Sequence, residues 1–210
     1  MMNKVLCSLL LFLSISCGLQ GRNANYARDS KRIWLDSKEI HHGEYVWKMK
    51  KAGDVISSAE KVSTLGYDTS DWLSAIVPGT VLNSLVYNKE YPEPYYGVNN
   101  KLESGKIPDI SKVGREFYTY WFRTEFDVPE SFAGKTIWLQ PDGVNYRAEI
   151  WVNGNLLSTL NGMFISDYIN VTDFVKVGRT KIIAVKVYTV DVTGTTMPNS
   201  WGDNGEFHKG

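Results

Sequence analysis

Residues 118 to 190 alternate in side-chain character with a period of two, and this feature limits the fold more than any other. One side of the stretch 120–128 carries Tyr120, Phe122, Thr124, Phe126 and Val128, and the other carries Trp121, Arg123, Glu125 and Asp127. Successive side chains of a strand point to opposite faces of its sheet. We therefore expect a strand here with one buried face and one mostly solvent-exposed face.

The strands that follow are separated by short turn sequences. The stretch 146–152 ends at Asn153-Gly154, a dipeptide that favours a tight hairpin with positive φ, and 155–160 is the returning arm. The stretches 137–140, 165–171 and 181–190 have the same short, strand-like character. Turns at this spacing, without long helical periods, predict an all-β sandwich rather than a βαβ fold.

The first half of the chain mixes short elements. Two short strands are expected at 33–35 and 45–49, on either side of a His41-His42-Gly43 turn. The stretch 75–77 is strand-like, Pro78-Gly79 imposes a turn, and Thr80 can cap a short helix that continues to Val86. The stretch 91–100 contains two prolines and three tyrosines and is predicted to be a loop.

The first 21 residues resemble a secretory signal peptide. A lysine at position 4 precedes an apolar run over 5–15, which is shorter than the roughly 20 residues that a membrane-spanning helix needs. Both cysteines, Cys7 and Cys17, lie in this leader, so no disulfide is expected in the mature domain. Cys17 also fits the lipidated position of a bacterial lipoprotein leader, an alternative to ordinary cleavage. We expect a linker over 22–32 and one domain over 33–210, secreted or periplasmic, with an outer-membrane lipoprotein as the alternative.

The charged residues exclude one class of partner. The chain carries 23 basic and 23 acidic residues without a long run of either sign, so its composition does not favour nucleic acid binding. Aromatic residues make up 13% of the chain, which suits an uncharged polar ligand better.

Six segments, in order along the chain, resemble the N-terminal domain of glycoside hydrolase family 2, and most closely its exo-β-glucosaminidase and β-mannosidase-like members. The segments are Val77-Pro78-Gly79-Thr80-Val81-Leu82, Glu93-Pro94-Tyr95-Tyr96-Gly97-Val98-Asn99, Trp121-Phe122-Arg123, the hairpin 145–154, Gly162-Met163-Phe164, and Val171-Thr172 followed by 184–187. Glu93 stands where the family usually has Asp, and the turn at Arg179-Thr180 also departs from the pattern.

This resemblance implies an all-β fold, a jelly-roll β-sandwich like that of galactose-binding domains. It also implies that the domain is non-catalytic and belongs to a secreted retaining exo-β-glycosidase that hydrolyses terminal β-linked sugars without a cofactor. The family's two catalytic carboxyl groups come from a later (β/α)8 barrel, which needs about 250 residues. We assign no catalytic residue and no metal site here, and we expect the last strand or strands of the sandwich to be missing at Gly210.

The candidate binding residues lie mainly in the predicted loop. By resemblance, this loop approaches the active-site mouth of the barrel and binds a carbohydrate, the terminal sugar. The candidates are Glu93, Tyr95, Tyr96, Asn99, Asn100 and, later in the chain, Trp201. In the alternative interpretation the loop only seals the interface with the barrel. Arg123 and Arg147 are expected to pair with Glu125 and Glu149 in a structural role.

Two other functions remain open. One is a stand-alone carbohydrate-binding lipoprotein, anchored through Cys17, without hydrolase activity. The other is a structural adhesion-type sandwich that binds no sugar. The first predicts measurable affinity for glycans, and neither predicts a downstream barrel.

Overall fold

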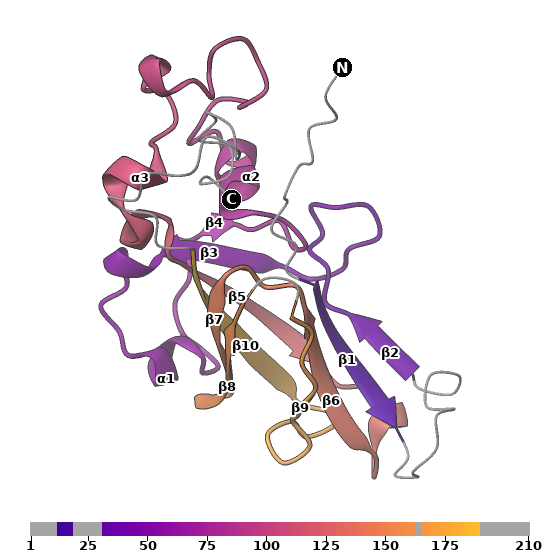
Figure 1. The fold of residues 1–210 in the computed structure, drawn as a ribbon. Coiled ribbons are helices and arrows are strands. Elements are labelled where there is room, and N and C mark those ends of the chain that lie inside the picture. Colours follow the sequence, from indigo (N-terminus) through magenta and orange to yellow (C-terminus); the bar gives the residue numbers. More distant parts are fainter. Residues whose placement is uncertain (1–11, 19–30, 163–164, 190–210) are drawn as a thin grey trace.

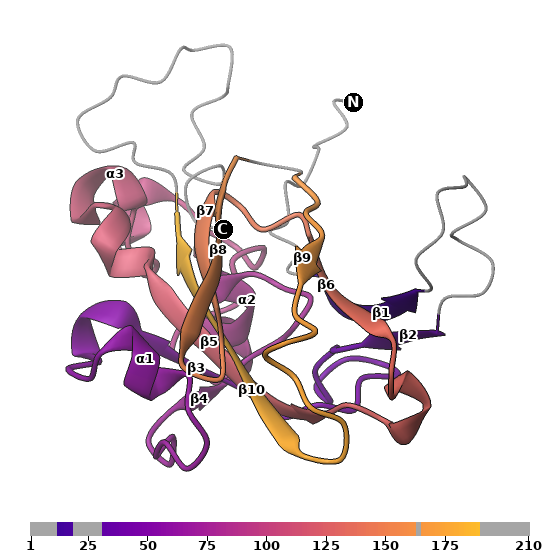
Figure 2. The ribbon, with the colours of Figure 1, turned by 90° about the horizontal axis from the view of Figure 1, so that it is seen from below.

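The protein forms two antiparallel β-sheets packed face to face, with α2 and α3 at one end and α1 beside the larger sheet (Figures 1 and 2). The computed structural model describes residues 12–18, 31–162 and 165–189. In the order of their pairing, the strands of the smaller sheet are β2 (Lys31–Trp34), β1 (Phe12–Gly18), β6 (Thr136–Asp142) and β9 (Ile169–Asn170). Those of the larger sheet are β4 (Leu73–Ser74), β3 (Trp47–Lys51), β5 (Tyr120–Asp127), β10 (Thr180–Tyr188), β7 (Arg147–Val152) and β8 (Asn155–Asn161).

Helical elements are short and lie outside the sandwich. The α-helices are α1 (Ala59–Val62), α2 (Val81–Tyr87) and α3 (Ile110–Val113), and the 3-10 turns span Ala52–Asp54, Leu102–Ser104, Arg115–Tyr118 and Glu130–Phe132. Within the described part of the chain, no helix has both the length and the apolar character needed to cross a membrane.

The main core lies between the two sheets. β6 and β9 supply Ile137, Leu139 and Ile169, and the larger sheet supplies Trp47 and Phe122, all of them buried. Because inward-facing residues alternate along every strand, the two sheets close over a single continuous cluster. The expected antiparallel sandwich is therefore confirmed.

The strand predicted over 120–128 is present, but its second face is not mostly exposed. Trp121 is 4% exposed and Arg123 is 3% exposed, although Glu125 and Asp127 reach solvent as expected. The segment of α1 folds over this half of the sheet. It buries a second cluster of side chains made of Val62, Trp72, Trp121, Trp151 and Ala184.

Local signals placed the turns correctly. Asn153 and Gly154 adopt φ 47° and 84°, which joins β7 to β8 in the expected tight hairpin. Thr80 accepts a hydrogen bond on its hydroxyl oxygen from the amide of Asn83 at 2.8 Å and caps α2 as predicted. His42, in the expected turn, has φ 70° and is exposed.

Other expectations need correction. The strand predicted over 75–77 is replaced by the two-residue β4, because the amide of Val77 donates to the Ser37 hydroxyl instead of a neighbouring strand. The strand predicted over 165–171 contains only β9, with one further bridge from Ser166 to Asp142. Residues 12–18, within the predicted leader, form β1 between β2 and β6. The leader and the domain limits stay predictions.

Candidate functional site

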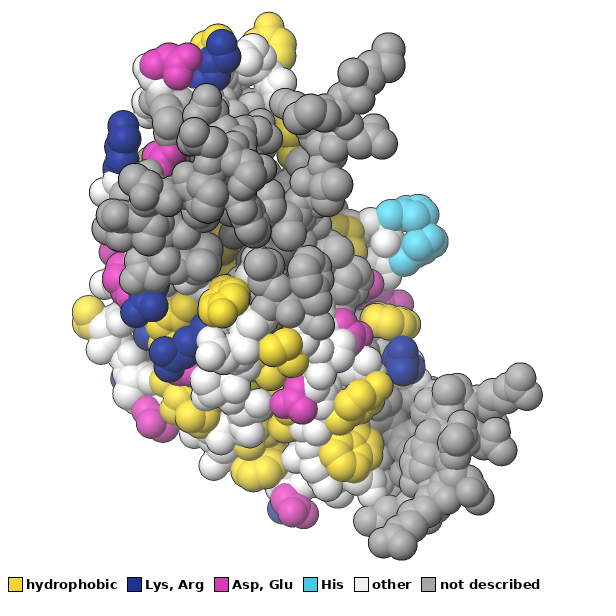
Figure 3. Space-filling view, in the orientation of Figure 1, with side chains coloured by type: hydrophobic (Ala, Val, Ile, Leu, Met, Phe, Trp, Pro, Cys, Tyr) yellow, Lys and Arg dark blue, Asp and Glu magenta, His cyan; other side chains and the backbone are white. Residues whose placement is uncertain are grey.

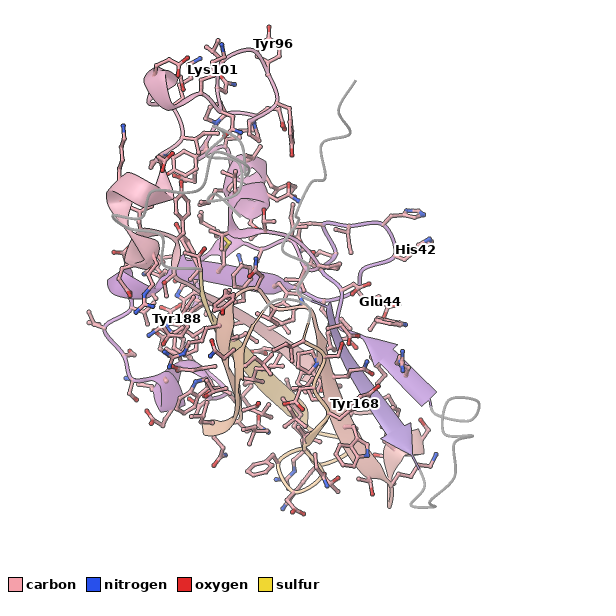
Figure 4. All side chains as sticks on the ribbon, in the orientation of Figure 1. His42, Glu44, Tyr96, Lys101, Tyr168 and Tyr188 are labelled. Carbon is pink, nitrogen blue, oxygen red and sulfur yellow. The ribbon has the colours of Figure 1, made fainter. Side chains whose placement is uncertain are left out.

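The loop 91–100 projects from the end of the sandwich beside α2 (Figure 4, Tyr96). It contains no helix or strand, as the two prolines predict. The side chains of Tyr95 and Tyr96 are 65% and 77% exposed, and Glu93 is exposed as well. The loop therefore presents two phenol rings and one carboxylate to solvent.

Asn99 holds the loop from inside. It is only 6% exposed, its amide nitrogen donates to the backbone oxygen of Glu93 at 2.8 Å, and its side-chain oxygen accepts from Lys106 Nζ at 2.9 Å. The backbone amide of Tyr96 also donates to the oxygen of Glu93. Gly97, at φ 58°, turns the chain through the left-handed region that favours glycine. This inward position makes Asn99 a positioning residue.

Three tyrosines anchor the base of the loop. Tyr91 packs against the main core, and the hydroxyl of Tyr118 donates to the Pro108 carbonyl at 2.5 Å. Burial raises the pKa of the Tyr120 phenol to about 12, with a smaller contribution from Tyr91. The pKa values of Tyr91 and Tyr118 are raised by the same cause. All three phenols stay protonated at neutral pH, so none of them adds a charge to the base of the loop.

The remaining candidates are placed less favourably. Asn100 is half-buried beside Asn99, and Trp201 lies outside the described residues. Cys17 lies in β1, opposite Lys31 and Ile137, in the smaller sheet. Sequence reasoning missed Lys106, since no periodic pattern links it to Asn99 seven positions earlier.

The exposed side chains of Glu93, Tyr95 and Tyr96 suit a neutral sugar. Aromatic faces pack against the C–H face of a pyranose ring, and a carboxylate accepts hydrogen bonds from its hydroxyl groups. Within the described ranges, no cluster of three or more His, Cys, Asp or Glu residues is arranged to hold a metal ion. Charged side chains of both signs are scattered over the face shown in Figure 3.

A separate cavity of about 620 Å³ opens at the far end of β5 and shares no residue with the loop. Its wall includes Tyr45, Glu44, Glu125 and Asp127. Burial raises the pKa of the Tyr45 phenol, and the carboxylates of Glu44 and Asp127 add to that shift. Arg123 also reaches this wall, with its guanidinium bonded to Glu125 at 3.2 Å.

The two arginines behave as expected. Arg123 is buried and pairs with Glu125, and the Arg147 Nη2 nitrogen lies 4.0 Å from Glu149. Arg147 also lies over the ring of Tyr188, at 5.0 Å from its centroid. Both side chains therefore support the larger sheet and do not contribute to the exposed loop.

A family model and several known proteins match this sequence. The family model described as glycosyl hydrolase 2 galactose-binding domain-like matches residues 47–197. A mannosylglycoprotein endo-β-mannosidase from Lilium longiflorum is 36% identical over 142 residues, covering 68% of this chain and 14% of that protein. An exo-β-D-glucosaminidase from Amycolatopsis orientalis is 28% identical over 139 residues, covering 65% of this chain and 12% of that protein. The chain thus spans a small part of these relatives.

Solved structures show the same likeness. The crystal structure of the Amycolatopsis orientalis exo-chitosanase CsxA superposes with a TM-score of 0.57 at 27% identity, covering 69% of this chain and 16% of that one. Since the family model spans well over half of the sequence, the chain belongs to the glycosyl hydrolase 2 galactose-binding domain-like family.

Proposed function

We propose that this chain is the N-terminal, non-catalytic domain of an exported retaining exo-β-glycosidase of family 2, acting on terminal β-linked sugars. One observation carries the proposal within this family: Tyr95, Tyr96 and Glu93 are exposed together on a loop that Asn99 and Lys106 hold in place. The names of the similar proteins, an exo-β-D-glucosaminidase and an endo-β-mannosidase, support a β-glycoside as the substrate class.

The loop would form one wall of a sugar subsite. The rings of Tyr95 and Tyr96 exclude water and pack on the apolar face of the terminal sugar, while Glu93 accepts hydrogen bonds from its hydroxyl groups. A retaining mechanism needs two carboxyl groups about 5–5.5 Å apart. We assign neither of them to this chain, so both would come from another domain of the same polypeptide.

The first test is to sequence the source DNA through and beyond codon 210. An open frame that continues into a barrel with two catalytic carboxylates supports the proposal, whereas a stop codon after Gly210 refutes it.

The second test uses the product of the whole open frame. We expect Tyr95→Ala and Tyr96→Ala to raise KM for p-nitrophenyl β-D-glucosaminide or the β-D-mannoside about tenfold, with a smaller change in kcat, because ground-state contacts are lost. Phe174→Ala is the control, since this aromatic side chain is 37% exposed in the turn between β9 and β10 and belongs to neither the loop nor any other proposed site. Unchanged kinetics in both loop variants would show that the loop only packs against its neighbour.

A further inference from the structure

The outer face of β6 and β9 carries a set of side chains that neither the core nor the loop explains. Ile137, Leu139 and Ile169 point into the main core. Because side chains alternate along a strand, Trp138 and its neighbours point the other way. This outward set is Trp138, Gln140, Tyr168 and Asn170.

The register of the two strands arranges these four residues as a square. Trp138 lies opposite Asn170, and Leu139 lies opposite Ile169. The bridge between Asp142 and Ser166 continues the same register, which places Gln140 opposite Tyr168. The two aromatic residues therefore occupy one diagonal and the two carboxamides the other, with directly opposed residues about 5 Å apart.

Local hydrogen bonds fix the polar groups before any ligand arrives. Asn170 Oδ1 accepts from the amide of Thr172 at 3.1 Å and from its hydroxyl at 2.7 Å. The backbone amide of Tyr168 donates to Asp167 Oδ1 at 2.8 Å, and Asp167 Oδ2 accepts from Ser158 at 3.2 Å. The face is thus rigid on the β9 side.

Gln140 supplies a second, independent observation. Its side chain is 8% exposed and donates from Nε2 to Asp142 Oδ1 at 2.9 Å, but its Oε1 accepts no hydrogen bond in the structure. A buried acceptor without a donor destabilises a fold, and such atoms are rare in native proteins. Gln140 Oε1 therefore needs a donor that the described residues do not supply, and a sugar hydroxyl is such a donor.

The chemistry of the square selects the ligand class. Two aromatic rings suit the flat C–H faces of pyranose rings, and two carboxamides suit hydroxyl groups. None of the four side chains is charged, and the nearby carboxylate of Asp142 is bonded to Gln140. An anionic ligand would find no cation among these four residues, and a purely apolar partner would offer no donor to Gln140 Oε1.

We propose that this face, formed by Trp138, Gln140, Tyr168 and Asn170, is a carbohydrate-binding site for a neutral pyranose chain. Figure 4 shows Tyr168 beside β6 and β9, far from Tyr96 on the loop. The site is therefore distinct from the proposed terminal-sugar subsite and does not depend on it. Its role would be to hold a neighbouring part of a polysaccharide against the domain.

The test is affinity electrophoresis of the whole 210-residue chain in native gels containing hydroxyethyl cellulose or glucomannan. We expect at least one polysaccharide to retard the protein. Trp138→Ala and Tyr168→Ala should each raise the apparent Kd for that polysaccharide about tenfold. Tyr87→Ala is the matched control, since this tyrosine is 53% exposed on α2, lies outside both proposed sites and should leave retardation unchanged. Tyr96→Ala tests the loop separately. Thermal unfolding of each variant checks that the fold is intact.

Gln140→Leu separates binding from structure. It removes an acceptor that has no donor, together with the hydrogen bond to the half-exposed Asp142, which water can replace. We therefore expect weaker retardation with only a small change in thermal stability. No retardation by either polysaccharide, or retardation that Trp138→Ala and Tyr168→Ala leave intact, overturns the proposal. Retardation lost only in Tyr96→Ala would assign sugar binding to the loop, which supports the proposed function and refutes this second site.

Discussion

Arg123 offers the sharpest test of how the α1 segment is attached to the larger sheet. Its side chain is buried on β5, where Nε donates to the carbonyl of Val62 and Nη2 to that of Thr64, each at 3.0 Å. These two carbonyls close the end of the α1 segment, so the guanidinium fixes that segment over Trp121. The same group also pairs with Glu125 at 3.2 Å, whose side chain is 47% exposed.

The expected losses of unfolding free energy distinguish the carbonyl contacts of Arg123 from its ion pair with Glu125. A hydrogen bond from a charged donor contributes roughly 1.5–3 kcal/mol, so Arg123→Met should lower the free energy of unfolding by about 3–5 kcal/mol, with both carbonyls left unpaired. A half-exposed ion pair contributes about 0–1 kcal/mol, so Glu125→Gln should cost less than about 1 kcal/mol. Methionine keeps much of the apolar stem, which limits the loss of packing.

Urea unfolding followed by circular dichroism measures both variants against the wild type. Hydrogen exchange at the amides of Val62 and Ser63, which close α1, should accelerate in Arg123→Met and not in Glu125→Gln. Equal losses of stability in the two variants would refute this reasoning. They would show that the two carbonyl contacts contribute no more than the ion pair to holding the α1 segment.

Three further predictions follow from single residues. Burial raises the pKa of Tyr120 to about 12, against an ordinary 10, so its contribution of roughly 1–3 kcal/mol to the free energy of unfolding is complete below pH 10 and is lost as the pH rises toward 12. The urea midpoint should therefore be lower at pH 11 than at pH 8, and equal midpoints would contradict the burial of this phenol. Asn99→Ala should release the loop from Lys106 and cost about 1–3 kcal/mol, seen as faster amide exchange confined to 93–106, whereas unchanged exchange would show that the carboxamide does not hold the loop. Gly79→Ala should cost more than about 1 kcal/mol, because its Cβ would lie 2.7 Å from the Ile76 carbonyl oxygen; an unchanged melting temperature would mean that the turn has room to shift.

Much of the sandwich could be predicted because its signals are local. The alternation over 120–128, the Asn153-Gly154 turn and the Thr80 cap each depend on neighbours only a few residues apart. The covering of the outer face could not be predicted in this way. It depends on contacts such as the one from Arg123 to Val62, 61 positions apart, and α1 has only four residues.

Only part of the candidate site could be predicted from the sequence. The composition of 91–100 predicted a loop, and Tyr95 and Tyr96 are exposed there. A loop has no period, so the sequence cannot tell an outward Asn from an inward one, and Asn99 proved to be buried. The pairing of Gln140 with Tyr168 could not be predicted either. The sequence indicated a strand over 165–171, whereas β9 has only two residues and its register depends on pairing with β6.

The predicted leader and β1 lead to a final test, because cleavage near residue 21 would remove a strand that pairs with both β2 and β6. If the leader is cleaved as proposed, the intact mass of the exported protein lacks it, and the β6 edge loses its partner. Amides of β6 should then exchange faster than those of β10, which is paired on both sides with β5 and β7. A lipidated Cys17 would add a diacylglycerol mass and leave only two residues of β1. An exported protein that still carries residues 1–21, with β6 protected as well as β10, would refute the leader and establish β1 as part of the domain.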